Sequence, residues 1–119
     1  MRTRAFQDLL VWQRSRALAG EVCRVAAGPA FNRDWGLRDQ LRRSAISVPS
    51  NIAEGNERGS DRDAVRFFFF ARGSLAELFT QSDIACELGL VDVESASDWM
   101  RECDDIARML SRLITSRRA

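Results

Sequence analysis

The stretch from Ser60 to Leu90 reads SDRDAVRFFFFARGSLAELFTQSDIACELGL. Its small and apolar residues follow one another at alternating spacings of four and three, a pattern typical of one side of a packed α-helix. Ser60, with Asp63 three residues later, is typical of a helix start, and Gly89 followed by Leu90 is typical of a helix end. The pattern predicts one long helix over residues 60–88. The residues of this seam are Ala64, Phe68, Ala71, Leu75, Leu78, Ser82 and Ala85.

Three further helices are predicted around this one, over residues of about 6–27, 36–54 and 92–115. Gly28-Pro29 ends the first, residues 28–35 form a loop, and Gly55 is expected to end the second as a left-handed cap. No stretch alternates as a β-strand does. We therefore expect an all-α fold, a single domain over residues 1–119, built as an antiparallel up-down-up-down four-helix bundle.

Composition limits the function. The 119 residues include 18 arginines against 17 acidic residues, and lysine, histidine and tyrosine are missing. Without histidine or lysine there is no imidazole base and no Schiff-base amine, so we expect a non-enzyme with no cofactor and no metal. The cysteines are odd in number and widely spaced, which favours buried thiols over disulfides or zinc ligands. No apolar run suits a signal peptide or a membrane span, so we expect a cytoplasmic protein.

Four consecutive phenylalanines, Phe67 to Phe70, sweep roughly 300° around the axis of the long helix. Phe68 lies on the seam, so one bundle core does not hold them all. Because large exposed apolar patches mark contacts, we expect Phe67, Phe69 and Phe70 to form a subunit interface. The alternative is that a kinked neighbouring helix or the loop at residues 28–35, with Phe31 and Trp35, covers them within one chain.

A polar motif occupies the predicted second helix around Pro49, which removes one helical hydrogen bond. We expect a structural polar network there that links helices. The alternative is a direct binding role for Asn51, Glu54 or Arg58. Gly73-Ser74 on the third helix is expected to allow close approach of another helix. The motif comprises Arg42, Arg43, Ser47, Pro49, Ser50, Asn51 and Glu54.

Arginines gather near both ends of the chain. If the first and last helices are antiparallel neighbours, the two chain ends meet, and a basic surface of this kind suits phosphate groups. Arg24 would extend it. The alternatives are that arginines near the C-terminus offset a helix dipole or are solvated and frayed, and that those of the first helix pair with acidic residues of neighbouring subunits. The nucleic-acid-binding candidates are Arg2, Arg4, Arg14, Arg16, Arg112, Arg117 and Arg118.

One enzyme class is a competing hypothesis. Helical nucleotide pyrophosphohydrolases hold Mg²⁺ with carboxylates spaced along helices, and Glu54-x-x-Glu57 and Glu94-x-x-x-Asp98 have similar spacings. However, acidic residues near a helix start, as at Glu94, are also expected from capping and from the helix dipole.

Three segments carry a resemblance that covers nearly the whole chain. They are FQDLLVWQ at residues 6–13, LRDQLRRSAISVPSNIAEG at 37–55 and RFFFFARGSLAE at 66–77. The chain resembles the small bacterial four-helix-bundle proteins named for intervening sequences in large-subunit (23S) ribosomal RNA genes. The resemblance implies a homopentamer. It also implies kinship with the accessory variability determinant of diversity-generating retroelements, which binds RNA and a reverse transcriptase through basic surfaces. The expected partners are therefore further copies of the chain, and RNA or a nucleic-acid-handling protein. The alternative is a protein-interaction scaffold that binds no nucleic acid.

Overall fold

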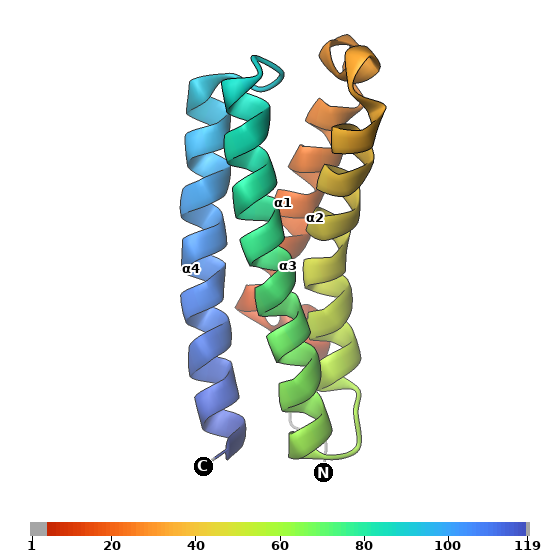
Figure 1. Cartoon of the computed structure of the whole chain (residues 1–119). Helices are drawn as coiled ribbons and strands as arrows, with labels where there is room; N and C mark the ends of the chain where they lie inside the picture. Colours follow the sequence, from red (N-terminus) through yellow and green to blue (C-terminus); the bar gives the residue numbers. More distant parts are fainter. Residues whose placement is uncertain (1–4, 119) are drawn as a thin grey trace.

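The computed structural model describes residues 5–118, which form an all-α bundle (Figure 1). Its long helices are α1 (Leu10–Ala26), α2 (Trp35–Asn56), α3 (Asp61–Glu87) and α4 (Val93–Arg118), and two short 3-10 helices are η1 (Phe6–Asp8) and η2 (Pro29–Arg33). No strand occurs among the described residues. The predicted all-α class with four helices is confirmed. Successive helices run in opposite directions along the long axis.

The helices pack around the seam of α3. All seven seam residues are buried, and Phe68, Leu78 and Ala85 are fully inaccessible. α3 packs along both α2 and α4, α1 packs along α2, and the contact between α1 and α4 is much smaller. The core facing α3 comprises Leu41, Ala45, Val48 and Ile52 of α2, and Ala96, Trp99, Cys103, Ile106, Leu110 and Ile114 of α4.

The ends of α3 follow the capping chemistry that the sequence predicts. The Asp63 amide donates to Ser60 Oγ at 3.2 Å, which satisfies one amide of the first turn. At the other end Gly89 has φ +74°, a conformation that suits glycine. The Leu90 amide donates to the Ala85 carbonyl at 2.9 Å and the Gly89 amide to the Cys86 carbonyl at 3.0 Å. This pair of bonds is a Schellman ending, and it directs the chain into α4.

The prediction for Gly55 is wrong. α2 continues through it to Asn56, and Gly89 is the one described residue with a positive φ. A Cβ at Gly55 would lie 2.7 Å from Phe68 Cε1 and 3.1 Å from the Ala64 carbonyl oxygen. Glycine is therefore needed for close packing of α2 against α3, not for a turn.

Two other boundaries differ from the prediction. The first helix begins at Leu10 instead of residue 6, after the separate turn η1. The expected loop at 28–35 contains η2, whose Phe31 is fully buried. This loop lies at the opposite end of the bundle from the start of α3, so it does not cover the phenylalanine run (Figure 1). No described helix combines the length and apolarity needed to cross a membrane.

Candidate nucleic-acid interface

The turn between α2 and α3 and the last turn of α4 meet at one end of the molecule (Figure 1). Arg117 joins them: its Nη2 donates to Asn56 Oδ1 at 3.0 Å, and its Nη1 lies 3.6 Å from Asp61 Oδ1. The Arg117 side chain is only 23% exposed. It therefore anchors the end of α4 to this turn.

The four phenylalanines at the start of α3 occupy different environments. Phe68 is fully buried, Phe67 is half-buried, and Phe69 and Phe70 are 39% and 47% exposed. The rings of Phe67 and Phe70 meet edge to face with centroids 5.6 Å apart. As the sequence predicts, one core does not hold all four rings, and two of them face outward.

Guanidinium groups lie over every ring of this run. Arg58 and Arg66 each lie 4.9 Å from the centroid of Phe67, and Arg66 is also 5.6 Å from that of Phe70. Phe69 carries Arg72 at 5.4 Å and Arg118 at 5.2 Å. Such contacts are favourable because the ring face is negative. We call this region the arginine–phenylalanine surface; it comprises Arg58, Arg62, Arg66, Arg72, Arg117, Arg118, Phe67, Phe69 and Phe70.

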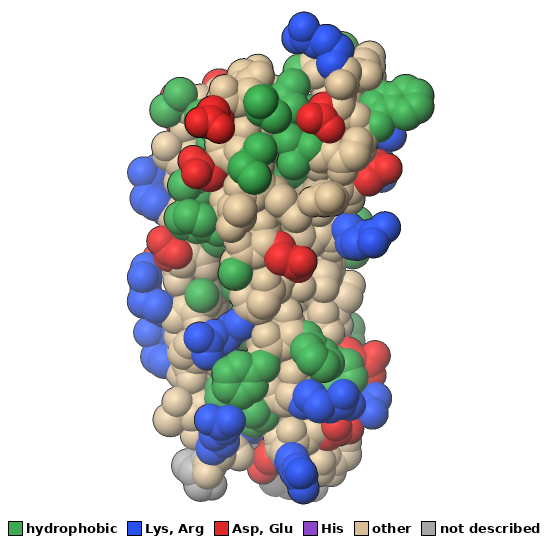
Figure 2. Space-filling model, in the orientation of Figure 1, with side chains coloured by type: hydrophobic (Ala, Val, Ile, Leu, Met, Phe, Trp, Pro, Cys, Tyr) green, Lys and Arg blue, Asp and Glu red, His purple; other side chains and the backbone are tan. Residues whose placement is uncertain are grey.

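Figure 2 shows the mixed character of this end, where hydrophobic and basic side chains adjoin in the lower part of the view. Acidic residues balance some of the charge. Asp63 accepts from Arg58 Nε at 2.9 Å and from Arg66 Nε at 3.3 Å, and Glu54 lies 3.1 Å from Arg58 Nη1. The hydrogen bond from Arg58 is the main reason why the pKa of Asp63 lies below its usual value. Asp63 is therefore an anion at neutral pH.

Three arginines of the surface keep an unbalanced charge. Arg62, Arg72 and Arg118 are exposed and form no ion pair within residues 5–118. Arg72 and Arg118 lie instead over the exposed ring of Phe69. Aromatic rings next to exposed cations form a surface suited to both parts of a nucleotide, the flat base and the charged phosphate.

The surface is hollowed on both sides of Phe69. The first hollow, of about 500 Å³, is lined by Asp61, Arg62, Val65, Arg66, Phe69, Arg117 and Arg118. The second, of about 460 Å³, is lined by Ser47, Asn51, Phe69, Phe70, Gly73, Ser74 and Glu77. Phe69 is the residue that they share.

The structure brings together only part of the predicted basic set. Arg117 and Arg118 lie on the surface, while Arg112 is exposed on α4 one to two turns earlier. Arg2 and Arg4 lie outside the described residues. Sequence analysis did not predict Arg62, Arg66 and Arg72 because it considered the arginines near the two ends of the chain. The four-residue spacing of Arg58, Arg62 and Arg66 was the signal that could have found them.

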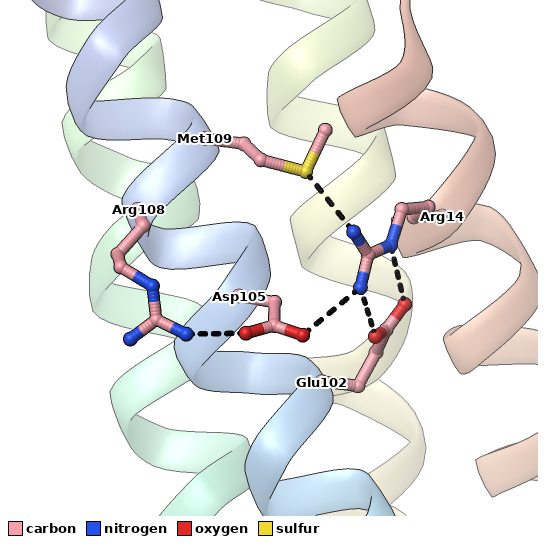
Figure 3. Close-up of polar contacts among 5 residues, drawn as sticks. All are labelled: Arg14, Glu102, Asp105, Arg108 and Met109. Atoms are coloured by element: carbon pink, nitrogen blue, oxygen red, sulfur yellow. Dashed lines mark hydrogen bonds and ion pairs between the residues drawn. The ribbon is translucent and has the colours of Figure 1, made fainter.

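Arg14 needs a correction, because it is held in a network within the chain (Figure 3). Its Nε and Nη2 donate to the two carboxylate oxygens of Glu102 at 3.0 and 2.5 Å, and Nη2 also reaches Asp105 at 3.2 Å. The hydrogen bond to Glu102 is the main cause that raises the pKa of Arg14. Arg14 therefore links α1 to α4, which otherwise make little contact, and it is not available to phosphate. Arg16 is exposed on α1.

The polar motif around Pro49 is also only partly assembled. Ser47 Oγ lies 2.8 Å from Ser74 Oγ of α3, and Asn51 Nδ2 donates to both the carbonyl and the hydroxyl of Ser47 at 2.9 Å. Pro49 is buried inside an unbroken α2. The remaining members of the motif take no part in this contact: Arg42, Arg43 and Ser50 are exposed, and Glu54 pairs with Arg58.

The expected close approach at Gly73 is wrong. A Cβ at Gly73 would meet no atom within 4 Å, so no neighbouring helix requires a glycine there. Ser74, the next residue, does face α2. A second serine contact of this kind was not predicted from the sequence: Ser44 Oγ donates to Gln81 Oε1 at 2.7 Å.

The carboxylate pairs of the pyrophosphohydrolase hypothesis do not converge. Glu54 and Glu57 lie at the end of α2, whereas Glu94 and Asp98 lie at the start of α4, at the other end of the bundle (Figure 1). No group of three or more potential ligands among the described residues is placed to hold a metal ion. The arrangement therefore lacks the shared carboxylate cluster that this chemistry requires.

The family assignment follows from a match over residues 7–112 to the model of the 23S rRNA-intervening sequence protein family. The chain belongs to this family. Its fold is similar to that of a protein of unknown function from the S23 ribosomal protein family of Bacteroides thetaiotaomicron, with a TM-score of 0.80 and 17% sequence identity. The match covers 88% of this chain and 98% of that one, and at this identity it shows the fold alone. Comparison with curated protein sequences finds no match.

Proposed function

We propose that the chain is a non-catalytic, cytoplasmic binding module that contacts RNA, or an RNA–protein complex, through the arginine–phenylalanine surface. The observation that carries this proposal is the pair of cations, Arg72 and Arg118, held over the exposed ring of Phe69 beside Arg62. Phosphate-binding charge and an accessible aromatic face occur there together. The near-zero net charge of the whole chain does not oppose this, because six of its 18 arginines gather on this one surface.

The test is fluorescence anisotropy with a structured RNA over a salt series. The variant Arg62→Glu plus Arg118→Glu removes two cations that form no ion pair in the described structure. The matched control is Arg33→Glu plus Arg101→Glu, which makes the same charge change at exposed positions of η2 and α4, outside the arginine–phenylalanine surface. We expect weaker binding and a salt dependence shallower by about 1.4 in log–log slope, from about 0.7 per single-strand phosphate contact, only in the first variant. Equal losses in both variants would contradict the proposal, and absence of RNA binding in the wild type would favour the protein-scaffold alternative.

Self-association is the second part of the proposal, with the pentamer as the stoichiometry that the resemblance implies. A like-with-like contact through the arginine–phenylalanine surface would bring unpaired cations together, which is unfavourable. The turn between α3 and α4 is better suited. Ile84, Leu88 and Val93 are 42%, 56% and 72% exposed there. We call this region the acidic apolar end. It comprises these three apolar residues and the neighbouring acidic residues Asp83, Glu87, Asp92 and Glu94.

A complementary surface lies on α2, where Trp35 and Ile46 are 62% and 48% exposed. The exposed Arg42 and Arg43 follow on the same helix. An acidic apolar end of one copy against a basic apolar α2 of the next is a heterologous contact, which closes into a ring when its rotation allows. This arrangement leaves the arginine–phenylalanine surface open to RNA. Light scattering that shows only monomers at micromolar concentration would overturn this part.

A further inference from the structure

The two hollows beside Phe69 point to a ligand more specific than a polyanion. We propose that they take two successive unpaired nucleotides of a single strand, with the ring of Phe69 between the two bases. This inference rests on the proposed nucleic-acid function and names its substrate class. Phe69 is the observation behind this inference, because its 39% exposed ring borders both the 500 Å³ and the 460 Å³ hollow.

Charge sets the orientation of the strand. Four arginines line the first hollow, whereas the second contains a single charged side chain, the carboxylate of Glu77. Phosphates therefore lie on the side of the first hollow, over Arg62 and Arg118. In the free protein the guanidinium groups of Arg72 and Arg118 lie over Phe69. On binding, a base takes their place on the ring and they turn to phosphate oxygens, which replaces a cation–π contact with charge-assisted hydrogen bonds.

Gly73 is the second observation in favour of an open site. It is an exposed glycine inside the 27-residue helix α3, a position where glycine is destabilising relative to alanine. Neither a positive φ nor a close neighbour requires it. The absence of a side chain keeps the floor of the second hollow clear, and a base lying on Phe69 explains why that space is needed.

The polar groups of the second hollow select the base. Asn51 Nδ2 is already donated to Ser47, whereas Asn51 Oδ1 accepts no hydrogen bond from a described residue. Glu77 adds further acceptors. Acceptors pair with an exocyclic amino group, as on cytosine, and not with the carbonyl that uracil carries at the same position. A paired strand presents neither base face, so a duplex does not fill the hollows.

The experiment measures anisotropy of fluorescein-labelled octamers: oligo(rC), oligo(rU), oligo(dC) and an RNA duplex of the same length. Phe69→Ala removes the shared wall, and Gly73→Leu fills the second hollow. Their controls are Leu10→Ala, at a 57% exposed position of α1, and Gly20→Leu, a second helical glycine whose added Cβ meets nothing within 4 Å. Thermal unfolding of all four variants confirms that each is folded. Phe69→Trp keeps the stacking surface and is the rescue variant.

We expect oligo(rC) to bind more tightly than oligo(rU) and the duplex, and Phe69→Ala and Gly73→Leu each to lose about fivefold or more, the lower limit for one stacked base. The controls and Phe69→Trp keep the affinity of the wild type. Oligo(dC) decides whether the sugar matters: equal binding assigns the site to single strands in general, and weaker binding assigns it to RNA.

Equal affinity for the duplex, or unchanged binding by Phe69→Ala in a protein that Arg62→Glu plus Arg118→Glu weakens, overturns this inference and leaves the proposed function standing. Equal affinity for oligo(rC) and oligo(rU) overturns the placement of a base beside Glu77. If polyglutamate at equal charge displaces the strand, the surface recognises negative charge alone, and the inference of two bound nucleotides is overturned. Absence of binding by every nucleic acid overturns the proposed function itself.

Discussion

Two surfaces at opposite ends of this bundle, the arginine–phenylalanine surface and the acidic apolar end, present different chemistry. At the arginine–phenylalanine surface, aromatic rings lie beneath guanidinium groups, and three of the arginines have no carboxylate partner among the described residues. At the acidic apolar end, exposed aliphatic side chains alternate with Asp83, Glu87, Asp92 and Glu94. A net charge of +1 conceals this division completely.

The comparison shows how helix packing creates a charged surface that no single segment contains. Arg58 and Arg66 lie over Phe67, and the antiparallel course of α3 and α4 brings Arg118, from the far end of the chain, over Phe69. The two surfaces favour two different partners: phosphate for the arginine–phenylalanine surface, and a basic surface of another copy for the acidic apolar end.

The largest expected effect is on the free energy of unfolding. It compares a buried ring at one end of the bundle with an exposed side chain at the other. Phe68 is fully buried and touches the position of Gly55. Phe68→Ala is expected to lower the free energy of unfolding by about 3–5 kcal/mol, since it removes a core ring and leaves a cavity. Leu88→Ala, at a 56% exposed position, is expected to cost under about 1 kcal/mol. Urea unfolding measures both, and equal costs would contradict the division between core and surface described above.

The sequence was sufficient to predict the four helices, the buried seam of α3 and both of its caps. Those features depend on spacing and on local hydrogen bonds, as Ser60 and Gly89 show. It was not sufficient for Gly55, because a cap glycine and a close-packing glycine look alike until the partner ring, Phe68, is known. Arg14 was misassigned for a similar reason, since its partner Glu102 lies 88 residues away.

A charge exchange tests the acidic apolar end. Asp83→Arg plus Glu87→Arg is expected to weaken self-association by at least about tenfold, because two attractive contacts with a basic α2 become repulsive. Adding Arg42→Glu and Arg43→Glu to the same chain is expected to restore it, since the contact is heterologous and both surfaces are then reversed. Sedimentation velocity over a concentration series measures the change.

Two outcomes show which surface mediates self-association. Failure of the fourfold variant to reassociate would show that α2 is not the complementary surface. If Phe69→Ala plus Phe70→Ala abolishes self-association and the charge exchange has no effect, the phenylalanines form the interface, as the sequence pattern alone suggests. RNA binding by the dissociated variant is expected to persist per chain, although the gain from multivalent contact is lost.

The smallest expected effect is a pH dependence confined to the arginine–phenylalanine surface. The pKa of Asp63 is lowered, chiefly by Arg58 and also by Arg66, so its contribution to stability is present above about pH 4 and is lost as the pH falls through the lower folded value. Protonation releases both arginines. Affinity for oligo(rU) is therefore expected to rise only below about pH 4, and Asp63→Asn is expected to show a two- to fivefold rise already at pH 7. Asp98→Asn is the control, because it breaks a comparable pair with Arg101 on α4, away from this surface. A similar rise in both variants would mean that total charge, not the arginines over Phe67, governs binding.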